Sequence, residues 1–333
     1  LVDALGDHLA DVATANGQTP EALRAALSLD TTMRIARSGA LYYSEVDRGE
    51  TADATALEDL TASDPAEPLV PLEDTFTLAS RPGADRVVYL DFDGEEIRGR
   101  VLNDDGPRVP QGYVMKPYDT DGVEGFSDTE LAEIQQIWRR VVELYAIYDI
   151  NVTTERPSVS DLTRSNASDS RFGSHHVITG DDEIRQRCNC GGQAWSHSFA
   201  FTTNHYYYQL SYSIGLPGTT VHAVAGAVTH EVGHQLALRH DGFHADGYRH
   251  AYYIGRYADQ TSIGVPQGDN DVWAPIMGAS YHNPIPRWSN GDYRGGNDFQ
   301  NDIVVKGTFE FSFFDVPADF PFPLTGEFAV FRM

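Results

Sequence analysis

The residues best suited to chemistry lie in one stretch, 230–241, which reads His-Glu-Val-Gly-His-Gln-Leu-Ala-Leu-Arg-His-Asp. His230 and His234 are four residues apart, which on an α-helix is about 400° of rotation and about 6 Å of rise. Both imidazoles therefore leave the same face and can bind one zinc ion, with Glu231 beside them to take a proton from a zinc-bound water. His240 is a candidate third ligand. Three neutral ligands and a water make the open, catalytic type of zinc site, whereas a structural site has four protein ligands.

The neighbouring sequence predicts that a packed helix carries these histidines. Residues 217–220, Pro-Gly-Thr-Thr, are typical of a turn followed by a helix N-cap. The apolar residues that follow are spaced for one buried face of a helix: Val221, Val224, Ala225, Val228, Val232 and Leu236. A polar helix end with solvated histidines is the alternative, and this apolar face argues against it.

The same stretch resembles the signature of the metzincin zinc peptidases, His-Glu-x-x-His-x-x-Gly-x-x-His followed downstream by a methionine turn. Asp241, directly after the third histidine, is similar to the adamalysin, or reprolysin, branch. Residues 274–281, Ala-Pro-Ile-Met-Gly-Ala-Ser-Tyr, supply a candidate methionine turn, with Met277 thirty-seven residues beyond His240. The resemblance implies that Met277 forms a hydrophobic floor beneath the zinc and is not a ligand. Residues 281–288 also resemble a group of bacterial secreted metallopeptidases of this type.

One position departs from that signature, because the family's glycine falls at Ala237. On a straight helix, residue 240 would lie about 600° round from residue 234 and would face away from the metal. The chain must therefore turn sharply near Ala237, and alanine adopts the positive φ of such a turn at a cost of about 1 kcal/mol. If His240 did not reach the zinc, Asp241 or a downstream histidine would be its substitute.

Composition and charge narrow the classes of function. The chain has 333 residues, of which 41% are hydrophobic and 11% aromatic, enough for a substantial core. Its net charge of −25 argues against nucleic acid and anionic membrane surfaces as partners. No apolar run reaches the roughly 18–20 residues of a membrane-spanning helix. With the family resemblance, this predicts a secreted monomer that acts on protein or peptide substrates and from which a signal peptide has been removed.

Two further groups of residues are weak candidates for chemistry. Cys188 and Cys190 lack the second pair that a zinc site needs, so we expect free or locally bridged thiols with no catalytic part. Neither cysteine lies in the N-terminal segment, so the sequence gives no support to a cysteine of a propeptide that would bind and block the zinc. Residues 119–122 resemble the start of a calcium loop without the glutamate of the twelve-residue form, and residues 91–94 are similar. Turn chemistry explains both, and Ca²⁺ is the lesser alternative.

The chain divides into three parts. Residues 1–80 resemble a helical prosegment ahead of a peptidase, in which residues 19–27 form a helix opened by Thr-Pro-Glu. Residues 47–80, rich in Asp, Glu, Thr, Ala and Pro, are typical of a linker. An ordinary helical lobe is the alternative for this part. Residues 81–306 form the expected catalytic domain, and residues 307–333 a β-rich C-terminal tail, either a hairpin or the start of a larger module.

The order of the predicted elements indicates an α/β (α+β) fold. These elements are a strand at 86–92, a helix at 127–148, strands at 150–154, 176–179, 192–199 and 206–210, and the zinc helix. The resemblance, over roughly residues 80–305, implies a metzincin-like fold: a mixed twisted sheet with two long helices and the zinc site in a cleft between upper and lower subdomains. In that family an edge strand above the metal pairs with the extended substrate, and residues 192–199 occupy the corresponding place.

These observations predict a secreted zinc endopeptidase made as a zymogen. His230, His234 and His240 would hold one catalytic Zn²⁺. Glu231 would deprotonate the zinc-bound water and pass the proton to the leaving amine.

Two aromatic residues are candidates for the substrate pocket, Tyr281 and Trp195. In some metzincins an oxyanion-stabilising tyrosine follows the methionine by two residues, whereas Tyr281 follows Met277 by four. We therefore expect Tyr281 to form part of the wall of the substrate pocket. A second hypothesis is a non-catalytic zinc-containing binding or adhesion protein on a metzincin scaffold, which would have no need of Glu231. A third is a zincin with a glutamate as third ligand, which the position of His240 disfavours.

Overall fold

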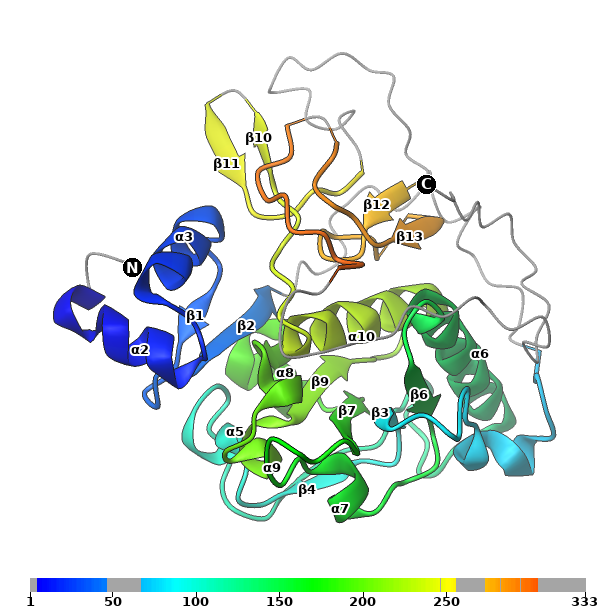
Figure 1. The fold of residues 1–333 in the computed structure, drawn as a ribbon. Coiled ribbons are helices and arrows are strands. Elements are labelled where there is room, and N and C mark those ends of the chain that lie inside the picture. The colour runs from blue at the N-terminus through cyan, green and yellow to red at the C-terminus, as the bar shows by residue number, and fades with distance from the viewer. Residues whose placement is uncertain are drawn as a thin grey trace.

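A seven-stranded mixed sheet lies at the centre of the described part of the protein (Figure 1). The computed structural model describes residues 5–46, 67–245, 247–255, 273–281, 283–293 and 295–304. Across the sheet the strands are ordered β1-β2-β8-β9-β7-β3-β6. Their bounds are Arg34–Ile35 for β1, Leu41–Val46 for β2, Arg86–Asp91 for β3, Ile150–Thr153 for β6, Phe172–Thr179 for β7, Cys190–Trp195 for β8 and Leu210–Ile214 for β9.

Strand direction changes at β8. Four neighbouring strands, β9, β7, β3 and β6, are all parallel to one another. Strand β8 is antiparallel to β9. Beyond β8, the N-terminal strand β2 is antiparallel to β8 and pairs with β1. Strand β8 would therefore be the edge of the sheet formed by residues after 67 if β2 were absent.

Two long helices, α6 (Asp128–Tyr145) and α10 (Val221–Gln235), pack against each other on one face of this sheet (Figure 1). Helix α6 begins with a capping box between Ser127 and Glu130, as the sequence predicts. Helix α10 begins where the Thr220 side chain accepts a hydrogen bond from the backbone N–H of Ala223. The shorter helices are η1 Gly6–His8, α2 Leu9–Ala15, α3 Pro20–Leu29, η3 Leu72–Thr77, α5 Val101–Asp104, α7 Val159–Leu162, α8 Asp182–Cys188, η4 Ser198–Ala200 and α9 His205–Tyr208.

The largest apolar cluster lies between the sheet and the two long helices. The predicted apolar face of the zinc helix is buried in it, which confirms that prediction: Val221, Val224, Ala225, Val228, Val232 and Leu236. From α6, Trp138 is buried and donates its indole N–H to the Val152 carbonyl of β6. The zinc helix is thus fixed on a rigid layer, and its positions are set by packing on several sides.

Three two-stranded ladders complete the described strands. Their bounds are Glu95–Ile97 for β4 and Tyr113–Met115 for β5, Phe243–Ala245 for β10 and Tyr248–His250 for β11, and Trp273–Pro275 for β12 and Ile285–Arg287 for β13. The last two ladders follow α10 in the chain and lie on the side of that helix away from the central sheet (Figure 1). The zinc helix therefore lies between the central sheet and this C-terminal part, as the predicted two-subdomain arrangement requires.

The N-terminal segment has a small core of its own. Helices α2 and α3 pack together, and Thr19 caps α3 with Pro20 at its first position, as predicted. The core side chains are Leu9, Val12, Ala13, Leu23, Ala26, Leu27, Met33, Leu41 and Tyr43. The prediction that this segment is helical omits strands β1 and β2, which join the central sheet.

Most of the other predicted elements are confirmed, with two corrections. The confirmed elements are the strands near 86–92, 150–154 and 176–179 and the helix near 127–148. Residues 192–199 form a strand only as far as Trp195, because His197 has a φ of +66° and a short 3-10 helix follows. The prediction of a strand at 206–210 is wrong, because residues 205–208 form helix α9 and pairing with β7 begins only at Leu210.

Residues 67–80, which the sequence places in the linker, are packed onto the folded body. Gln135 of α6 accepts hydrogen bonds from the backbone N–H groups of Leu69 and Val70. The Thr154 hydroxyl donates to the Thr75 carbonyl. The predicted linker at 47–66 and the predicted C-terminal tail at 307–333 lie outside the described residues. Among the helices that the structure describes, none is long and apolar enough to cross a membrane.

A buried histidine in β7 makes the stability of the fold depend on pH. His176 is fully buried, with its ring nitrogens 2.8 Å from Ser211 Oγ and 3.0 Å from Ser213 Oγ. Burial lowers the pKa of His176 to about 3. The unfolded chain has a histidine pKa near 6.5, so this contribution is complete above about pH 6.5 and is lost as the pH falls towards 3.

We expect the His176→Gln variant to show a weaker pH dependence of stability than the wild type. Between pH 7 and pH 5 the free energy of unfolding of the wild type should fall by about 2 kcal/mol more than that of the variant. Urea unfolding at the two pH values measures this difference. Equal pH dependence in both proteins would contradict the assignment.

Candidate metal centre

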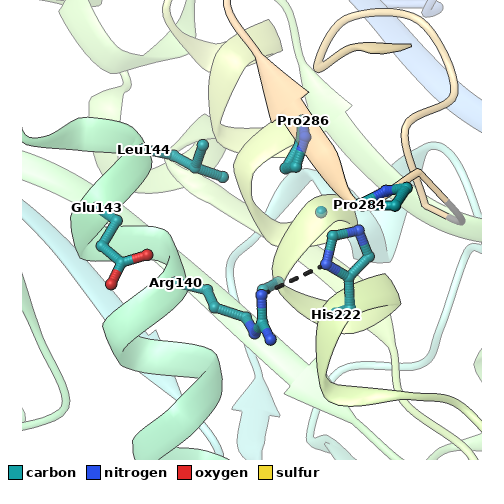
Figure 2. A pocket seen from close by; sticks show the side chains of 8 residues that line it. Arg140, Glu143, Leu144, His222, Pro284 and Pro286 are labelled. Carbon is teal, nitrogen blue, oxygen red and sulfur yellow. Dashed lines mark hydrogen bonds between the residues drawn. The ribbon is translucent and has the colours of Figure 1, made fainter. Parts of the chain in front are cut away.

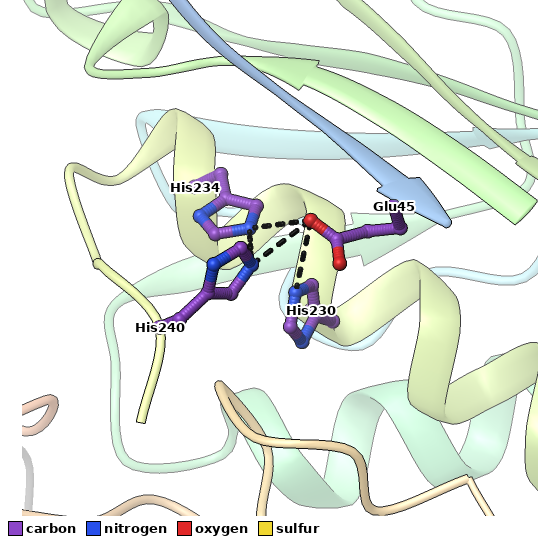
Figure 3. A group of neighbouring side chains, drawn as sticks. All are labelled: Glu45, His230, His234 and His240. Carbon is purple, nitrogen blue, oxygen red and sulfur yellow. Dashed lines mark hydrogen bonds and ion pairs between the residues drawn. The ribbon is translucent and has the colours of Figure 1, made fainter. Parts of the chain in front are cut away.

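Four side-chain atoms from two distant parts of the chain converge at the C-terminal half of α10 (Figure 3). His230 and His234 come from α10 and His240 from the loop that follows, while Glu45 comes from β2. Glu45 Oε1 lies 3.7 Å from His230 Nε2, 3.5 Å from His234 Nε2 and 2.9 Å from His240 Nε2. All four residues are buried. The predicted trio of histidines is thus brought together, and Glu45 joins it without having been predicted.

The two helix histidines are oriented by backbone carbonyl groups. His230 Nδ1 lies 2.7 Å from the Ile276 carbonyl oxygen, and His234 Nδ1 lies 2.8 Å from the Leu238 carbonyl oxygen. A carbonyl oxygen can only accept, so each Nδ1 carries the proton and each Nε2 offers a lone pair. Metal-binding histidines usually make such a hydrogen bond with the ring nitrogen that does not bind the metal.

His240 reaches the group because the chain reverses directly after α10. The N–H of Ala237 donates to the His234 carbonyl, and the N–H of Leu238 donates to the Gly233 carbonyl. This is the Schellman arrangement at a helix C-terminus, and Ala237 in it has a φ of +70°. The predicted sharp turn at Ala237 is confirmed, and His240 Nε2 comes to 3.0 Å from His234 Nε2.

We expect Ala237→Gly to raise the free energy of unfolding by about 1 kcal/mol, because glycine adopts positive φ without the steric cost that alanine bears. The matched control is Ala227→Gly in the interior of α10, which should lower it by about 1 kcal/mol. Chemical denaturation of the three proteins measures both changes. A destabilised Ala237→Gly variant would show that this turn is not strained.

The histidine cluster fits zinc. Zinc ligands at 2.0–2.1 Å in a tetrahedral site lie about 3.3 Å from one another. The four distances among the nitrogens and Glu45 Oε1 given above run from 2.9 to 3.7 Å. In addition, His230 Nε2 is buried and makes no hydrogen bond. A nitrogen lone pair left in this way is what a metal ligand requires and what a purely structural histidine avoids.

Glu231 lies beside the cluster, beneath β8. It is buried, and its Oε2 has no hydrogen-bond partner. Its Oε1 is so close to Gly192 of β8 that a Cβ on that glycine would lie 2.3 Å away. The carboxylate is therefore directed at the backbone of the strand that the sequence assigns to substrate pairing. Burial, together with the negative charge of Glu45, raises the pKa of Glu231 well above its usual range.

Charge is distributed unevenly among the histidines. Burial lowers the pKa of His234 to about 3, which keeps its ring neutral. Burial acts in the same direction on His240, but the carboxylates of Glu45 and Asp30 outweigh it and raise the pKa of His240 to about 10. Burial opposes the charge of Glu45, yet His240 and the hydrogen bonds of the cluster hold the pKa of Glu45 well below its usual range. A metal at this cluster would displace the His240 proton.

Met277 lies directly below the zinc helix. It is fully buried, and a Cβ on Gly233 would lie 2.6 Å from its Sδ. Gly233 directly precedes His234 on α10, so the methionine packs against the part of the helix that carries the second histidine. The Met277 carbonyl also accepts a hydrogen bond from the Asp241 N–H. Met277 is therefore buried against the zinc helix, and its part as a hydrophobic floor beneath the zinc stays a prediction.

The two predicted pocket residues differ in position. The ring of Tyr281 lies 6.0 Å from that of His230, so it borders the cluster. Trp195 is fully buried against Tyr42 and Tyr208 and is not brought to the cluster. It points to the opposite face of β8 from Gly192 because side chains alternate along a strand.

Sequence reasoning missed a tyrosine next to the third histidine. The ring of Tyr252 lies 4.5 Å from that of His240, and the side chain is buried. Burial raises the pKa of Tyr252, and the Glu45 carboxylate, to which it is hydrogen-bonded, raises it further. Tyr252 lies twelve residues beyond His240 and outside the motif, so nothing in the sequence pointed to its contact with the third histidine.

The acidic motifs weighed for calcium are explained by turns and ion pairs. Asp119 Oδ1 accepts hydrogen bonds from the backbone N–H groups of Asp121 and Gly122. Asp91 forms an ion pair with Arg156, and its Oδ2 lies within hydrogen-bonding distance, 2.6 Å, of His175 Nε2. Asp119, Asp121 and Glu130 lie close enough to share a metal ion, as do Asp91, Glu95 and His175, but these contacts account for the carboxylates without one. Cys188 and Cys190 are joined by a disulfide bond, one of the two states that the sequence left open.

A small pocket lies between α6, the N-terminal half of α10 and the chain after the methionine turn (Figure 2). Arg140 and His222 are in contact at its edge, with Arg140 Nη1 3.5 Å from His222 Nδ1. The other lining residues are Glu143, Leu144, Ala225, Gly226, Pro284 and Pro286. Gly226, one helical turn before His230 on α10, is the lining residue nearest in sequence to the cluster.

Comparison with known proteins agrees with this geometry. The family described as metallo-peptidase family M12B, reprolysin-like, matches residues 135–241, from the middle of α6 to the aspartate after His240. The chain carries a reprolysin-like metzincin domain. Neither the curated proteins nor the solved structures gave a significant match.

The mixed α/β sheet, the two long helices and the histidine cluster of this reprolysin-like domain confirm the predicted metzincin-like fold. The family is one of zinc metallopeptidases, so the domain is a zinc metalloprotease that acts on proteins or peptides. The matched range contains the three histidines and Glu231 but not Glu45 or Met277.

Proposed function

We propose that this protein is a secreted zinc endopeptidase in which His230, His234 and His240 hold the metal and Glu231 is the general base. The observation that carries the proposal is the convergence of three Nε2 atoms beside a buried carboxylate that has an unpartnered oxygen. Burying a carboxylate oxygen without a hydrogen-bond partner costs stability, and a part in catalysis explains why Glu231 is retained there.

The chemistry follows from the placement of these side chains. When bound, zinc polarises the scissile carbonyl group and the attacking water. The carbonyl groups of Ile276 and Leu238 hold the two helix imidazoles in the tautomer that presents Nε2. Glu231 accepts the proton of the attacking water and transfers it to the leaving amine, which makes that amine a neutral leaving group.

The surroundings supply the substrate contacts. An extended peptide would pair with the edge of β8, so that main-chain hydrogen bonds provide most of the affinity. Its scissile bond would then lie above Glu231. We propose that the pocket lined by Pro284 and Pro286 takes a side chain beside that bond, with Tyr281 as part of its wall. Met277 supports the helix histidines from below and takes no part in proton transfer.

We also propose that the enzyme is secreted and acts as a monomer. The acidic surface, at a net charge of −25, suits an extracellular protein that avoids nucleic acid. A zinc-binding adhesion protein on the same scaffold is the competing function. It is disfavoured because Glu231 costs stability where it is buried and would bring that protein no benefit.

Metal removal tests the proposal. We expect one zinc per chain, and cleavage of an unfolded protein once a protease site inserted within residues 47–66 has been cut to free the N-terminal segment. A chelator should abolish that cleavage and added Zn²⁺ should restore it. A cut protein that retains one zinc and cleaves nothing would contradict the peptidase function. An unchanged zinc content and activity in His240→Ala would contradict the ligand set instead.

A further inference from the structure

Strand β2 lies where an extended substrate would lie. Its residues pair antiparallel with β8 at Tyr42↔Trp195, Tyr43↔Ala194, Ser44↔Gln193 and Glu45↔Gly192. Without β2, the backbone groups of β8 on this side would be free to pair with a peptide. The N-terminal segment therefore covers the same edge that the proposed function requires.

The side chains of β2 alternate between two environments. Tyr42 packs against Trp195 on the face of the sheet away from α10, with ring centroids 4.8 Å apart and planes tilted by 37°. Tyr43 and Glu45 lie on the other face, over the zinc helix. The Tyr43 ring stacks on that of His234, with centroids 3.8 Å apart and planes within 13°. The register thus directs two consecutive inward side chains at the metal cluster.

Glu45 occupies the position opposite the histidines (Figure 3). Its Oε1 faces the Nε2 atoms of all three, at 2.9 to 3.7 Å. The pairing places Glu45 directly across from Gly192, the residue that contacts Glu231. The carboxylate therefore lies where the water and the scissile carbonyl of a substrate would have to be.

Further contacts from the same segment hold His240. Asp30 Oδ2 accepts a hydrogen bond from the His240 backbone N–H at 3.1 Å. The Thr32 hydroxyl lies 2.6 Å from His240 Nδ1. These contacts come from the loop between α3 and β1, so the inhibitory strand is anchored at both the metal and the third histidine.

We propose that Glu45 is a fourth protein ligand of the zinc and that β2 blocks the substrate edge of β8, so that residues 5–46 are an intramolecular inhibitor of the enzyme. The inference rests on the proposed function. A zinc with four protein ligands has no open position, as in structural sites. Because β2 is part of the same chain, its effective concentration is high, and it competes with any free peptide until its connection to the rest is cut.

The competing explanation is a structural lobe whose strand passes the metal cluster without binding the metal. Two probes separate these explanations without reference to catalysis. Cobalt(II) in place of zinc absorbs visible light according to the number and type of its ligands. Acetohydroxamate binds an open position on such a metal but cannot enter a site with four protein ligands.

The test compares the full-length wild type with Glu45→Gln, and with Glu21→Gln as the matched control from an exposed site on α3. We expect Glu45→Gln to change the cobalt spectrum and to bind acetohydroxamate about tenfold more tightly or better. The control should behave as the wild type. Tyr43→Ala, which removes the stacking on His234, is a second variant and should also raise hydroxamate affinity.

The outcomes are distinguishable. An unchanged spectrum and unchanged hydroxamate binding in Glu45→Gln, with the metal content of the wild type, would overturn the proposal. If Glu45→Gln does not fold, Tyr43→Ala decides by the same two measurements. If Glu45→Gln binds hydroxamate more tightly but neither the variants nor the protein cut within residues 47–66 cleave a peptide, Glu45 is supported as the ligand and the proposed peptidase function is contradicted. A gain in hydroxamate binding together with peptide cleavage would support both the Glu45 ligand and the peptidase function.

Discussion

The Glu231→Gln variant is expected to retain one zinc per chain and to lose peptide hydrolysis by a factor of about 10²–10⁴, measured after the cut within residues 47–66 has freed the N-terminal segment. Glutamine has the shape of glutamate but cannot accept a proton from the attacking water. The side chain is buried and none of the three histidines is changed, so metal binding should be preserved. The loss should appear in kcat, because proton transfer occurs in the chemical step.

The matched control is another buried glutamate far from the cluster. Glu130→Gln removes the carboxylate of the α6 capping box and should lower stability by about 1 kcal/mol without changing kcat. Metal analysis and steady-state kinetics on a cleavable peptide decide the outcome. If Glu231→Gln loses zinc together with activity, Glu231 supports the ligands and is not the base. If it keeps more than a tenth of the activity, another group takes the proton.

The catalytic half of the site could be predicted from the sequence because its signals are local. His230, Glu231 and His234 are fixed relative to one another by helical geometry alone. His240 is delivered by a turn whose need for positive φ follows from counting residues along a helix, and Ala237 adopts that φ. Met277 required the family resemblance, since a single buried methionine has no distinguishing pattern of its own.

The inhibitory half could not be predicted in the same way. Glu45 and Gly192 are paired across the sheet although nearly 150 positions separate them in the chain. No periodicity in a single sequence encodes such a partnership, because strand pairing is decided by the tertiary structure. The Leu-Tyr-Tyr-Ser-Glu-Val run at 41–46 does carry a strand signal in its aromatic and β-branched residues. That signal identifies a strand and leaves its neighbour unknown.

The misplaced strand at 206–210 illustrates a related limit. Three tyrosines and a leucine favour a strand by local propensity. In the structure, Tyr208 packs against Trp195 with ring centroids 5.7 Å apart, the Tyr207 hydroxyl donates to Asp104, and Asn204 before them adopts a φ of +55°. Tertiary contacts of the rings outweigh the local propensity, so the strand begins at Leu210 instead.

Gly192→Ala is expected to reduce kcat/KM by about 10²-fold once the cut within residues 47–66 has freed the N-terminal segment, with little change in zinc content. The new Cβ would lie 2.3 Å from Glu231 Oε1, 2.9 Å from its Cδ and 3.0 Å from its Cγ. Ordinary contact begins about 1 Å farther out, so the carboxylate must move by about that distance. A displacement of this size in a catalytic group can cost about 10²-fold.

The control for this variant is the neighbouring glycine of β8. A Cβ at Gly191 meets no atom within 4 Å, so Gly191→Ala should change kcat/KM less than about twofold. Both variants add one methyl group to the same strand, so loss of strand propensity cannot account for a difference between them. Equal kcat/KM in Gly192→Ala and Gly191→Ala would mean that Glu231 can shift without loss of activity. Catalysis would then not depend on its exact position under β8. A large loss in Gly192→Ala alone, with zinc retained, would show that catalysis depends on how closely this strand lies over the carboxylate.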